Sequence, residues 1–200
     1  MVAIIDYGVG NLLAIQNIIR KVGGNPIITN KAEEIEKADK LILPGVGAFG
    51  FGMEQLSERR LIGPLRQEVL VKGKVVLGLC LGAQLMTQWS EEGSVEGLGW
   101  VQGRAIKFDK EKVRVAPHMG WSDVDFIKST PFTEKLDNSR FYFAHSYHFS
   151  FDDLRFVTGW ARYGYAFPCS FQQDNIFGVQ FHPEKSHKFG MKLFENFLRL

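Results

Sequence analysis

Residues 74–86 have the sequence Lys-Val-Val-Leu-Gly-Leu-Cys-Leu-Gly-Ala-Gln-Leu-Met, and they restrict the possible folds more than any other stretch. The apolar run at 75–77 is led by two valines, is bounded by glycine and is too short for a helix, so it indicates a buried strand. Gly78 and Gly82 lie two residues before and after Cys80, where a sharp strand-to-helix turn needs missing side chains. We therefore predict a strand, a tight turn with Cys80 at its apex, and a helix packed closely on the strand.

The predicted position of Cys80 favours a reactive thiol. At the carboxyl end of a strand and the amino terminus of a helix, the helix dipole and free N–H groups favour thiolate over thiol. The alternative is that Cys80 is a small buried apolar residue, which is the usual role of a lone cysteine. The turn alone leaves both interpretations open.

Short apolar runs alternate with helical patterns in the first part of the chain. Strands are predicted at residues 2–6, 26–29 and 40–43, and helices at 12–22, 32–38, 53–59 and 62–71. This alternation predicts an α/β fold with a mainly parallel sheet and helices on both faces. The carboxyl ends of its strands share one edge, so the loops after Asp6, Leu43 and Leu79 are expected to meet at one site.

The second half is richer in strands. The predicted helix after Cys80 extends to about residue 89, and a helix is predicted at 187–200. Residues 173–175 form a predicted hairpin turn. Six further strands are predicted, at residues 99–108, 113–127, 140–149, 156–163, 166–172 and 176–181. With no linker or internal repeat, residues 1–200 are expected to form a single domain.

Composition excludes several classes of protein. The net charge is +2 with scattered basic residues, which does not indicate nucleic-acid binding. The two cysteines, Cys80 and Cys169, form neither a disulfide framework nor a zinc motif, so we expect no metal and no cofactor. With neither a signal peptide nor a membrane span in view, we expect a cytoplasmic protein that does not bind membranes.

The loop at residues 44–52, Pro-Gly-Val-Gly-Ala-Phe-Gly-Phe-Gly, contains four glycines. It includes a Gly-x-Gly-x-x-Gly pattern, so a phosphate-binding turn is one interpretation. We favour a second, in which backbone N–H groups face an anion that forms during a reaction, since glycine lets the chain approach closely. The third is an ordinary flexible loop.

The last predicted strand leads into His182-Pro183-Glu184. Proline disfavours helical geometry at His182, so residues 182 and 184 are expected to project to the same side of an extended chain. A glutamate there can orient the imidazole and leave its other nitrogen to face a thiol. By itself this sequence also fits a strand-end turn with an exposed acid.

Three motifs together resemble the class I, triad-type glutamine amidotransferases. They are Gly-x-Cys-x-Gly-x-Gln at 78–84, Pro-Gly-Val-Gly at 44–47 and Phe-His-Pro-Glu at 181–184. The segments 6–11, 117–121 and 142–147 also resemble the glutaminase subunits of imidazole glycerol phosphate synthases. The resemblance implies a flavodoxin-like sheet and hydrolysis of L-glutamine. It also implies that ammonia passes to a HisF-type (β/α)8-barrel cyclase in a heterodimer that serves histidine biosynthesis.

The resemblance also implies roles for individual residues. Cys80 would be the nucleophile, His182 the proton carrier and Glu184 its orienting partner. The oxyanion hole would use backbone N–H groups of Leu81 and of the turn containing Val46 and Gly47. Glutamine binding is implied for Gln84, Glu92, Ser146 and Tyr147, and contact with the synthase for Asn11, His118, Met119, Trp121 and Tyr142. For Trp121 and Tyr142, core packing is an equal alternative.

One residue departs from the pattern of these subunits. The family usually continues Gly-Trp-Asn, whereas Ser122 follows Trp121 here. A partner-facing contact is therefore expected to differ. The departure keeps open a paralogous glutaminase that feeds a HisF-like synthase in surface-polysaccharide sugar modification. A free-standing cysteine hydrolase and a catalytically idle binding module also stay open, although the intact Cys80, His182 and Glu184 argue against the idle module.

Overall fold

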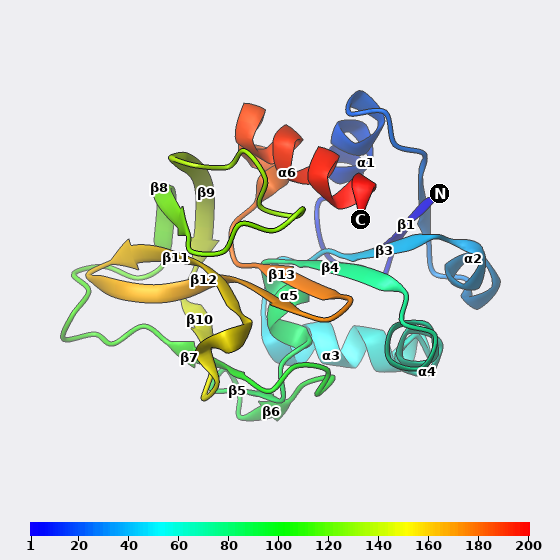
Figure 1. Cartoon of the computed structure of the whole chain (residues 1–200). Helices are drawn as coiled ribbons and strands as arrows, with labels where there is room; N and C mark the ends of the chain where they lie inside the picture. The colour runs from blue at the N-terminus through cyan, green and yellow to red at the C-terminus, as the bar shows by residue number, and fades with distance from the viewer.

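The computed structural model describes all 200 residues, Met1–Leu200, and contains two sheets (Figure 1). The larger sheet has the order β2-β1-β3-β4-β13-β12-β11-β8-β9. Its parallel part consists of β2 (Pro26–Thr29), β1 (Val2–Ile5), β3 (Lys40–Leu43), β4 (Val75–Leu79) and β13 (Ile176–Val179). Its antiparallel part consists of β12 (Tyr165–Gln173), β11 (Val157–Tyr163), β8 (His118–Phe126) and β9 (Ser139–His145).

The smaller sheet packs beside the antiparallel part and has the order β10-β7-β5-β6. Its strands are β10 (Tyr147–Ser150), β7 (Arg104–Lys107), β5 (Trp89–Ser90) and β6 (Val95–Glu96). The expected strand at 140–149 is therefore divided at Ser146 into β9 and β10, which belong to different sheets. This division leaves Ser146 at the junction of the two sheets.

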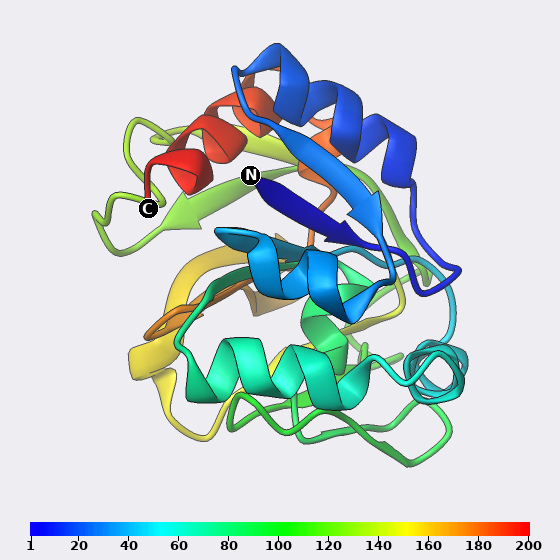
Figure 2. The same ribbon diagram turned by 90° about the vertical axis from the view of Figure 1, so that its right-hand side faces the viewer.

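Helices cover both faces of the parallel strands (Figure 2). One face carries α1 (Leu12–Lys21) and α6 (His187–Arg199), and the other carries α2 (Ala32–Lys37), α3 (Phe49–Glu58), α4 (Ile62–Arg66) and α5 (Leu81–Leu85). Strand β1 shows why both faces need cover. Ala3 and Ile5 belong to the apolar cluster under α2–α5, whereas Val2 and Ile4 belong to the cluster under α1 and α6. The predicted parallel α/β core is confirmed.

Two predicted helix boundaries were wrong. Helix α3 begins at Phe49 rather than near residue 53, because the Glu92 carboxylate accepts the Phe49 N–H at 2.8 Å and so stabilises an earlier start. Helix α5 ends at Leu85 instead of continuing to about residue 89. Backbone N–H groups of residues 97–100 donate hydrogen bonds to the carbonyls of residues 85–88, so these carbonyls are not used to continue the helix. Trp89–Ser90 forms β5 instead.

Three strands of the second half are clearly shorter than expected. Of residues 99–108 only Arg104–Lys107 is strand, the strand expected at 113–127 begins at His118, and the one expected at 176–181 ends at Val179. The hairpin at 173–175 is confirmed, because β12 and β13 are antiparallel neighbours on either side of Asp174 and Asn175. The remaining short elements are a π-helical turn at Gln67–Val71 and 3₁₀ turns at Leu154–Phe156 and Pro183–Lys185.

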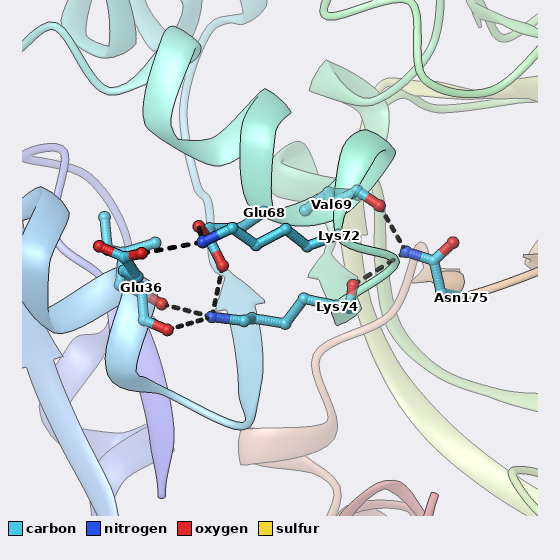
Figure 3. Close-up of polar contacts among 7 residues, drawn as sticks. Glu36, Glu68, Val69, Lys72, Lys74 and Asn175 are labelled. Atoms are coloured by element: carbon cyan, nitrogen blue, oxygen red, sulfur yellow. Dashed lines mark hydrogen bonds and ion pairs between the residues drawn. The ribbon is translucent and has the colours of Figure 1, made fainter.

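A cluster of charged and polar side chains stabilises the end of the sheet where β4 and β13 begin (Figure 3). The buried carboxylate of Glu68 lies 2.8 Å from Lys72 Nζ and 2.7 Å from Lys74 Nζ. Lys74 also donates to the carbonyls of Ile35 and Glu36 at the end of α2. These contacts join α2, the π-helical turn and the start of β4 at the end of the sheet opposite to Cys80.

No helix of the structure has both the length and the apolar character that crossing a membrane requires.

Candidate active site

Cys80 occupies a strained turn between β4 and α5. Its backbone has φ +50° and ψ −111°, a conformation that costs free energy for any residue with a Cβ and is typical of functional turns. A Cβ on Gly78 would lie 2.5 Å from Ala83 Cα, and one on Gly82 would lie 1.9 Å from the Leu43 carbonyl oxygen. The two glycines are therefore required for the close packing of β4, α5 and β3, as the sequence predicts.

His182 and Glu184 follow the end of β13 and form a close pair. The His182 N–H donates to the Tyr142 carbonyl at 2.8 Å, and its Nδ1 lies 2.8 Å from Glu184 Oε1, with both side chains 3% exposed. His182 is extended, as expected, but Glu184 lies in the 3₁₀ turn Pro183–Lys185. The two side chains meet because this turn brings the carboxylate back, not because an extended chain projects both to one side.

His182 and Cys80 line the same pocket, and their side chains interact there. Burial of the imidazole lowers its pKa, but the negative charge and hydrogen bond of Cys80, followed by those of Glu184, outweigh burial and raise the pKa of His182 to about 10. The structure therefore stabilises the protonated form of His182 next to the Cys80 side chain. A cysteine beside a histidine that carries its proton is the arrangement of an activated nucleophile.

The glycine-rich loop after β3 lies beside the turn at Cys80. Val46 and Gly47 line the same pocket as Cys80, and Gly47 has φ +105°. The buried Tyr7 hydroxyl donates to the Pro44 carbonyl, and burial raises the pKa of Tyr7, so the phenol stays a neutral donor. The loops after β1, β3 and β4 therefore meet, as predicted. The Glu92 carboxylate already takes the first N–H of α3, which disfavours a phosphate at that helix terminus.

The pocket around Cys80 has a volume of about 270 Å³. It brings together the catalytic candidates Cys80 and His182, and the predicted substrate-binding residues line it with them: Gln84, Glu92, Ser146 and Tyr147. Leu81 also lines it, and its N–H belongs to the first turn of α5, where helix N–H groups have no partner within the helix. The structure thus collects the predicted catalytic, oxyanion and binding residues in one place.

Gln84 is held in a defined orientation. Its amide nitrogen donates both hydrogens, one to the Tyr147 carbonyl and one to Gln180 Oε1, each at 2.9 Å. A ligand can therefore meet this amide only at its oxygen.

The predicted partner-facing residues divide into exposed and buried ones. Met119 is 65% exposed and Trp121 is 41% exposed, and the Trp121 ring stacks on His187 with centroids 5.5 Å apart. Tyr142 lies half-buried against the edge of Trp121, and Asn11 caps α1 by accepting the Ala14 N–H. A purely core role for Trp121 does not fit its exposure.

His118 lies inside the molecule, so its side chain does not share the exposed face. Its Nε2 lies 2.9 Å from Ser122 Oγ and its Nδ1 lies 3.0 Å from His145 Nε2. Burial lowers the pKa of His118 to about 4 and lowers that of His145 well below its ordinary value. Ser122, the departure from the family pattern, therefore contacts a neutral histidine pair at the pocket wall, and its hydroxyl points inward.

Two residues of the site were not predicted from the sequence. Tyr7 holds the loop after β3, and Gln180 lies fully buried with its amide nitrogen 3.6 Å from Cys80 Sγ. The available signal for Gln180 was a polar residue inside the otherwise apolar run Val-Gln-Phe, since a buried amide needs partners. A larger hollow of about 500 Å³ on the sheet surface near Asp123 and Trp160 contains no nucleophile.

Residues 3–200 match the family model described as Glutamine amidotransferase class-I. The chain belongs to the class-I glutamine amidotransferase family. The match covers both sheets and all six α-helices.

Two relatives and two solved structures extend this assignment. The chain is 49% identical to "Imidazole glycerol phosphate synthase subunit HisH 2" of Methanococcus maripaludis, over 100% of this chain and 99% of the relative. It is 44% identical to the subunit of the same name from Pseudomonas aeruginosa, over 100% of both chains. "Structure of PurLQS from Thermotoga maritima" has a TM-score of 0.78 at 18% identity, covering 99% of this amidotransferase and 97% of that chain. "Crystal structure of glutamine amidotransferase" has a TM-score of 0.76 at 19% identity, covering 100% and 98%. These two structures support the fold.

Proposed function

We propose that this amidotransferase is the glutaminase subunit of an imidazole glycerol phosphate synthase, with residues 1–200 as a single domain. It hydrolyses L-glutamine to L-glutamate and ammonia. The ammonia passes to a HisF-type (β/α)8-barrel cyclase, which forms imidazole glycerol phosphate and AICAR in histidine biosynthesis. The observation that carries the proposal is the buried Cys80–His182–Glu184 arrangement in a chain that matches HisH subunits along its whole length.

The first half of the reaction forms a thioester. The Cys80 thiolate attacks the carboxamide carbon of glutamine, and the carbonyl oxygen becomes an oxyanion facing the N–H groups of Leu81 and of the Val46–Gly47 turn. Oxyanion donors of this kind are worth about 3–4 kcal/mol each. His182 then gives its proton to the departing nitrogen, the C–N bond breaks and ammonia leaves. Glu184 stabilises the imidazolium before this transfer and keeps the ring oriented.

The second half releases glutamate. Neutral His182 accepts a proton from water, the resulting hydroxide attacks the thioester carbon, and the C–S bond breaks to return the thiolate. His182 ends protonated, which restores the starting ion pair. In this scheme the Gln84 oxygen, the Glu92 carboxylate and the chain at Ser146 and Tyr147 hold the amino-acid end of glutamine. The buried free thiols fit a reducing, cytoplasmic setting.

Chemical labelling tests the nucleophile. A glutamine-analogue electrophile is expected to modify Cys80 and to stop glutaminase activity, and Cys80→Ala is expected to lose both labelling and activity while keeping the fold. Cys169→Ala is the matched control, because Cys169 is fully buried and burial raises its pKa well above the ordinary value. Labelling of Cys169 in the native protein, with Cys80 unmodified, would refute the assignment.

Exposed apolar residues at the rim of the pocket support the proposal that a partner subunit covers it. Val46 is 43% exposed and Met119 is 65% exposed, and both line the pocket of Cys80. Ammonia released into neutral water becomes ammonium and loses its nucleophilicity, so a glutaminase that feeds a synthase benefits from a covered site. We expect weak glutaminase activity from the isolated chain and a clear rise with the barrel synthase and its acceptor substrate.

The partner assay compares steady-state glutaminase activity with and without that synthase. Trp121→Ala is expected to weaken the activation without removing Cys80 labelling. Full activity of the chain alone, unchanged by the synthase, would instead support the free-standing hydrolase.

Ser122 supports a second candidate, the paralogous subunit for surface-polysaccharide sugar modification. It replaces the usual asparagine and contacts His118, which in turn contacts the pocket-lining His145. Activation by a HisF-like sugar-modifying synthase, but not by the histidine-pathway cyclase, would decide for this candidate.

A further inference from the structure

Gln180 lies between the nucleophile and the glutamine-binding wall of the pocket. It directly follows β13, is fully buried, and places its amide nitrogen 3.6 Å from Cys80 Sγ. Its oxygen accepts a hydrogen bond from Gln84 at 2.9 Å. One side chain therefore touches both the reacting sulfur and a residue of the binding wall.

The orientation of the Gln180 amide follows from its neighbours. The Tyr147 carbonyl can only accept, so the group of Gln84 that faces it must be the NH₂ group. The second hydrogen of that NH₂ faces Gln180, which must therefore present its oxygen there. Its own NH₂ is left to face the sulfur, where it can only donate.

The Tyr147 carbonyl also fixes the other side of the pocket. His145 Nδ1 lies 2.8 Å from it and must carry the proton, so His145 Nε2 accepts from His118. Because His145 Nδ1 donates its proton to the Tyr147 carbonyl, this N–H is not available to Cys80. The Gln180 amide is a side-chain donor that lies within hydrogen-bond distance of the sulfur, at 3.6 Å.

We propose that Gln180 is a catalytic residue, which stabilises the Cys80 thiolate by donating an N–H hydrogen bond to its sulfur. The inference deepens the proposed function and depends on Cys80 being the nucleophile. Cys80 is 5% exposed, so its anion receives little water, and a fixed donor takes the place of solvent. The same bond stabilises the sulfur when it leaves the thioester as thiolate.

The Gln180 N–H also stays available when His182 loses its proton. When His182 gives its proton to the departing nitrogen, the imidazolium charge disappears from beside the sulfur. Gln180 cannot lose a proton in the working pH range, so its N–H stays in place through both halves of the reaction. The amide therefore donates to the sulfur whatever the protonation state of His182.

The test measures how fast iodoacetamide alkylates Cys80 between pH 4 and pH 9, because only the thiolate reacts. In Gln180→Met, loss of one hydrogen bond to a charged group is expected to lower the thiolate-to-thiol ratio about tenfold, which moves the pH of half-maximal labelling up by about one unit. Glutaminase kcat is expected to fall more than KM rises.

Gln180→Glu provides a second variant of nearly identical shape. Its carboxylate still accepts from Gln84 but puts a negative charge beside the sulfur, so the labelling profile is expected to move further than in Gln180→Met. Gln67→Met, at an exposed glutamine of the π-helical turn, is the matched control and is expected to label as the wild type. Cys169 serves as an internal measure of folding, since it reacts only when the core loosens.

Profiles of both Gln180 variants that coincide with the wild type, with kcat within twofold, would overturn the inference. A shift accompanied by rapid labelling of Cys169 would also overturn it, because packing would then explain the effect. Failure of the proposed function is distinguishable: the glutamine-analogue electrophile would then leave wild-type Cys80 unmodified.

Discussion

Replacing Glu184 with glutamine tests how the histidine is supported. The change keeps the shape of the side chain but removes the charge that lies 2.8 Å from His182 Nδ1 in a buried pair. A hydrogen bond to a charged group contributes about 1.5–3 kcal/mol, which corresponds to a loss in kcat of about 10- to 150-fold. The loss rises toward about 10⁴-fold if the new amide turns its NH₂ toward Nδ1 and reverses the tautomer.

The structure also predicts that Glu184→Gln leaves the reactivity of the Cys80 thiol largely intact. Cys80 raises the pKa of His182 more than Glu184 does, so His182 is expected to stay protonated beside Cys80 in Glu184→Gln. We therefore expect Cys80 alkylation by iodoacetamide to stay within about threefold of wild type at pH 7 while kcat falls, since a threefold change corresponds to about 0.7 kcal/mol. KM is expected to change little, because the chemical step is affected more than substrate binding.

Single-turnover glutaminase assays and alkylation rates on the same preparation separate these effects. Lys188→Gln is a useful control, because Lys188 is an exposed residue at the start of α6 and does not line the pocket of Cys80. A Glu184→Gln enzyme with kcat within twofold of wild type would show that the carboxylate is not needed. Loss of alkylation together with kcat would show that Glu184, and not Cys80, is the main support of the imidazolium.

Three further changes have expected outcomes. Gly82→Ala is expected to destabilise the fold by at least about 1–3 kcal/mol, measured by urea unfolding, because its Cβ would lie 1.9 Å from a β3 carbonyl oxygen. Tyr7→Phe leaves the buried Pro44 carbonyl without its donor and is expected to cost about 1–3 kcal/mol and to lower kcat, whereas Tyr163→Phe, which removes an exposed hydrogen bond, costs less. Glu68→Gln is expected to cost about 1–3 kcal/mol at pH 7, or roughly 2–4 °C in Tm per kcal/mol. Burial opposes ionisation of Glu68, but its lysine partners outweigh burial and lower its pKa, so this difference from wild type is fully present above pH 4.5 and disappears as the pH falls through the folded value.

The parallel core could be predicted because its signals are local. Residues 26–29 and 40–43 are strands with the predicted limits, since each apolar run is bounded by polar residues or proline. The turn at Cys80 was also local, because Gly78 and Gly82 mark it directly. The prediction that the loops after β1, β3 and β4 meet then followed from the rule that the carboxyl ends of parallel strands lie at one edge of the sheet.

The errors come from contacts between distant parts of the chain. The start of α3 depends on Glu92, which lies 43 residues further along, and the end of α5 depends on N–H groups of the loop at 97–100. Gln180 was missed for the same reason, since a single glutamine in an apolar run does not reveal that its partner is the nucleophile. Spacing identified the pair His182 and Glu184, although a 3₁₀ turn rather than an extended chain brings them together.

The predicted partner-facing residues Trp121 and Tyr142 lie next to His182, which gives a physical reason to expect that a partner affects activity. The carbonyl of Tyr142 holds the backbone N–H of His182 at 2.8 Å, and Trp121 packs against Tyr142 and stacks on His187 at the start of α6. Trp121 is therefore in contact with the strand that positions His182, and it is not among the residues that line the pocket of Cys80. This separation explains why Trp121→Ala is expected to weaken activation by the synthase while the thiol remains open to labelling.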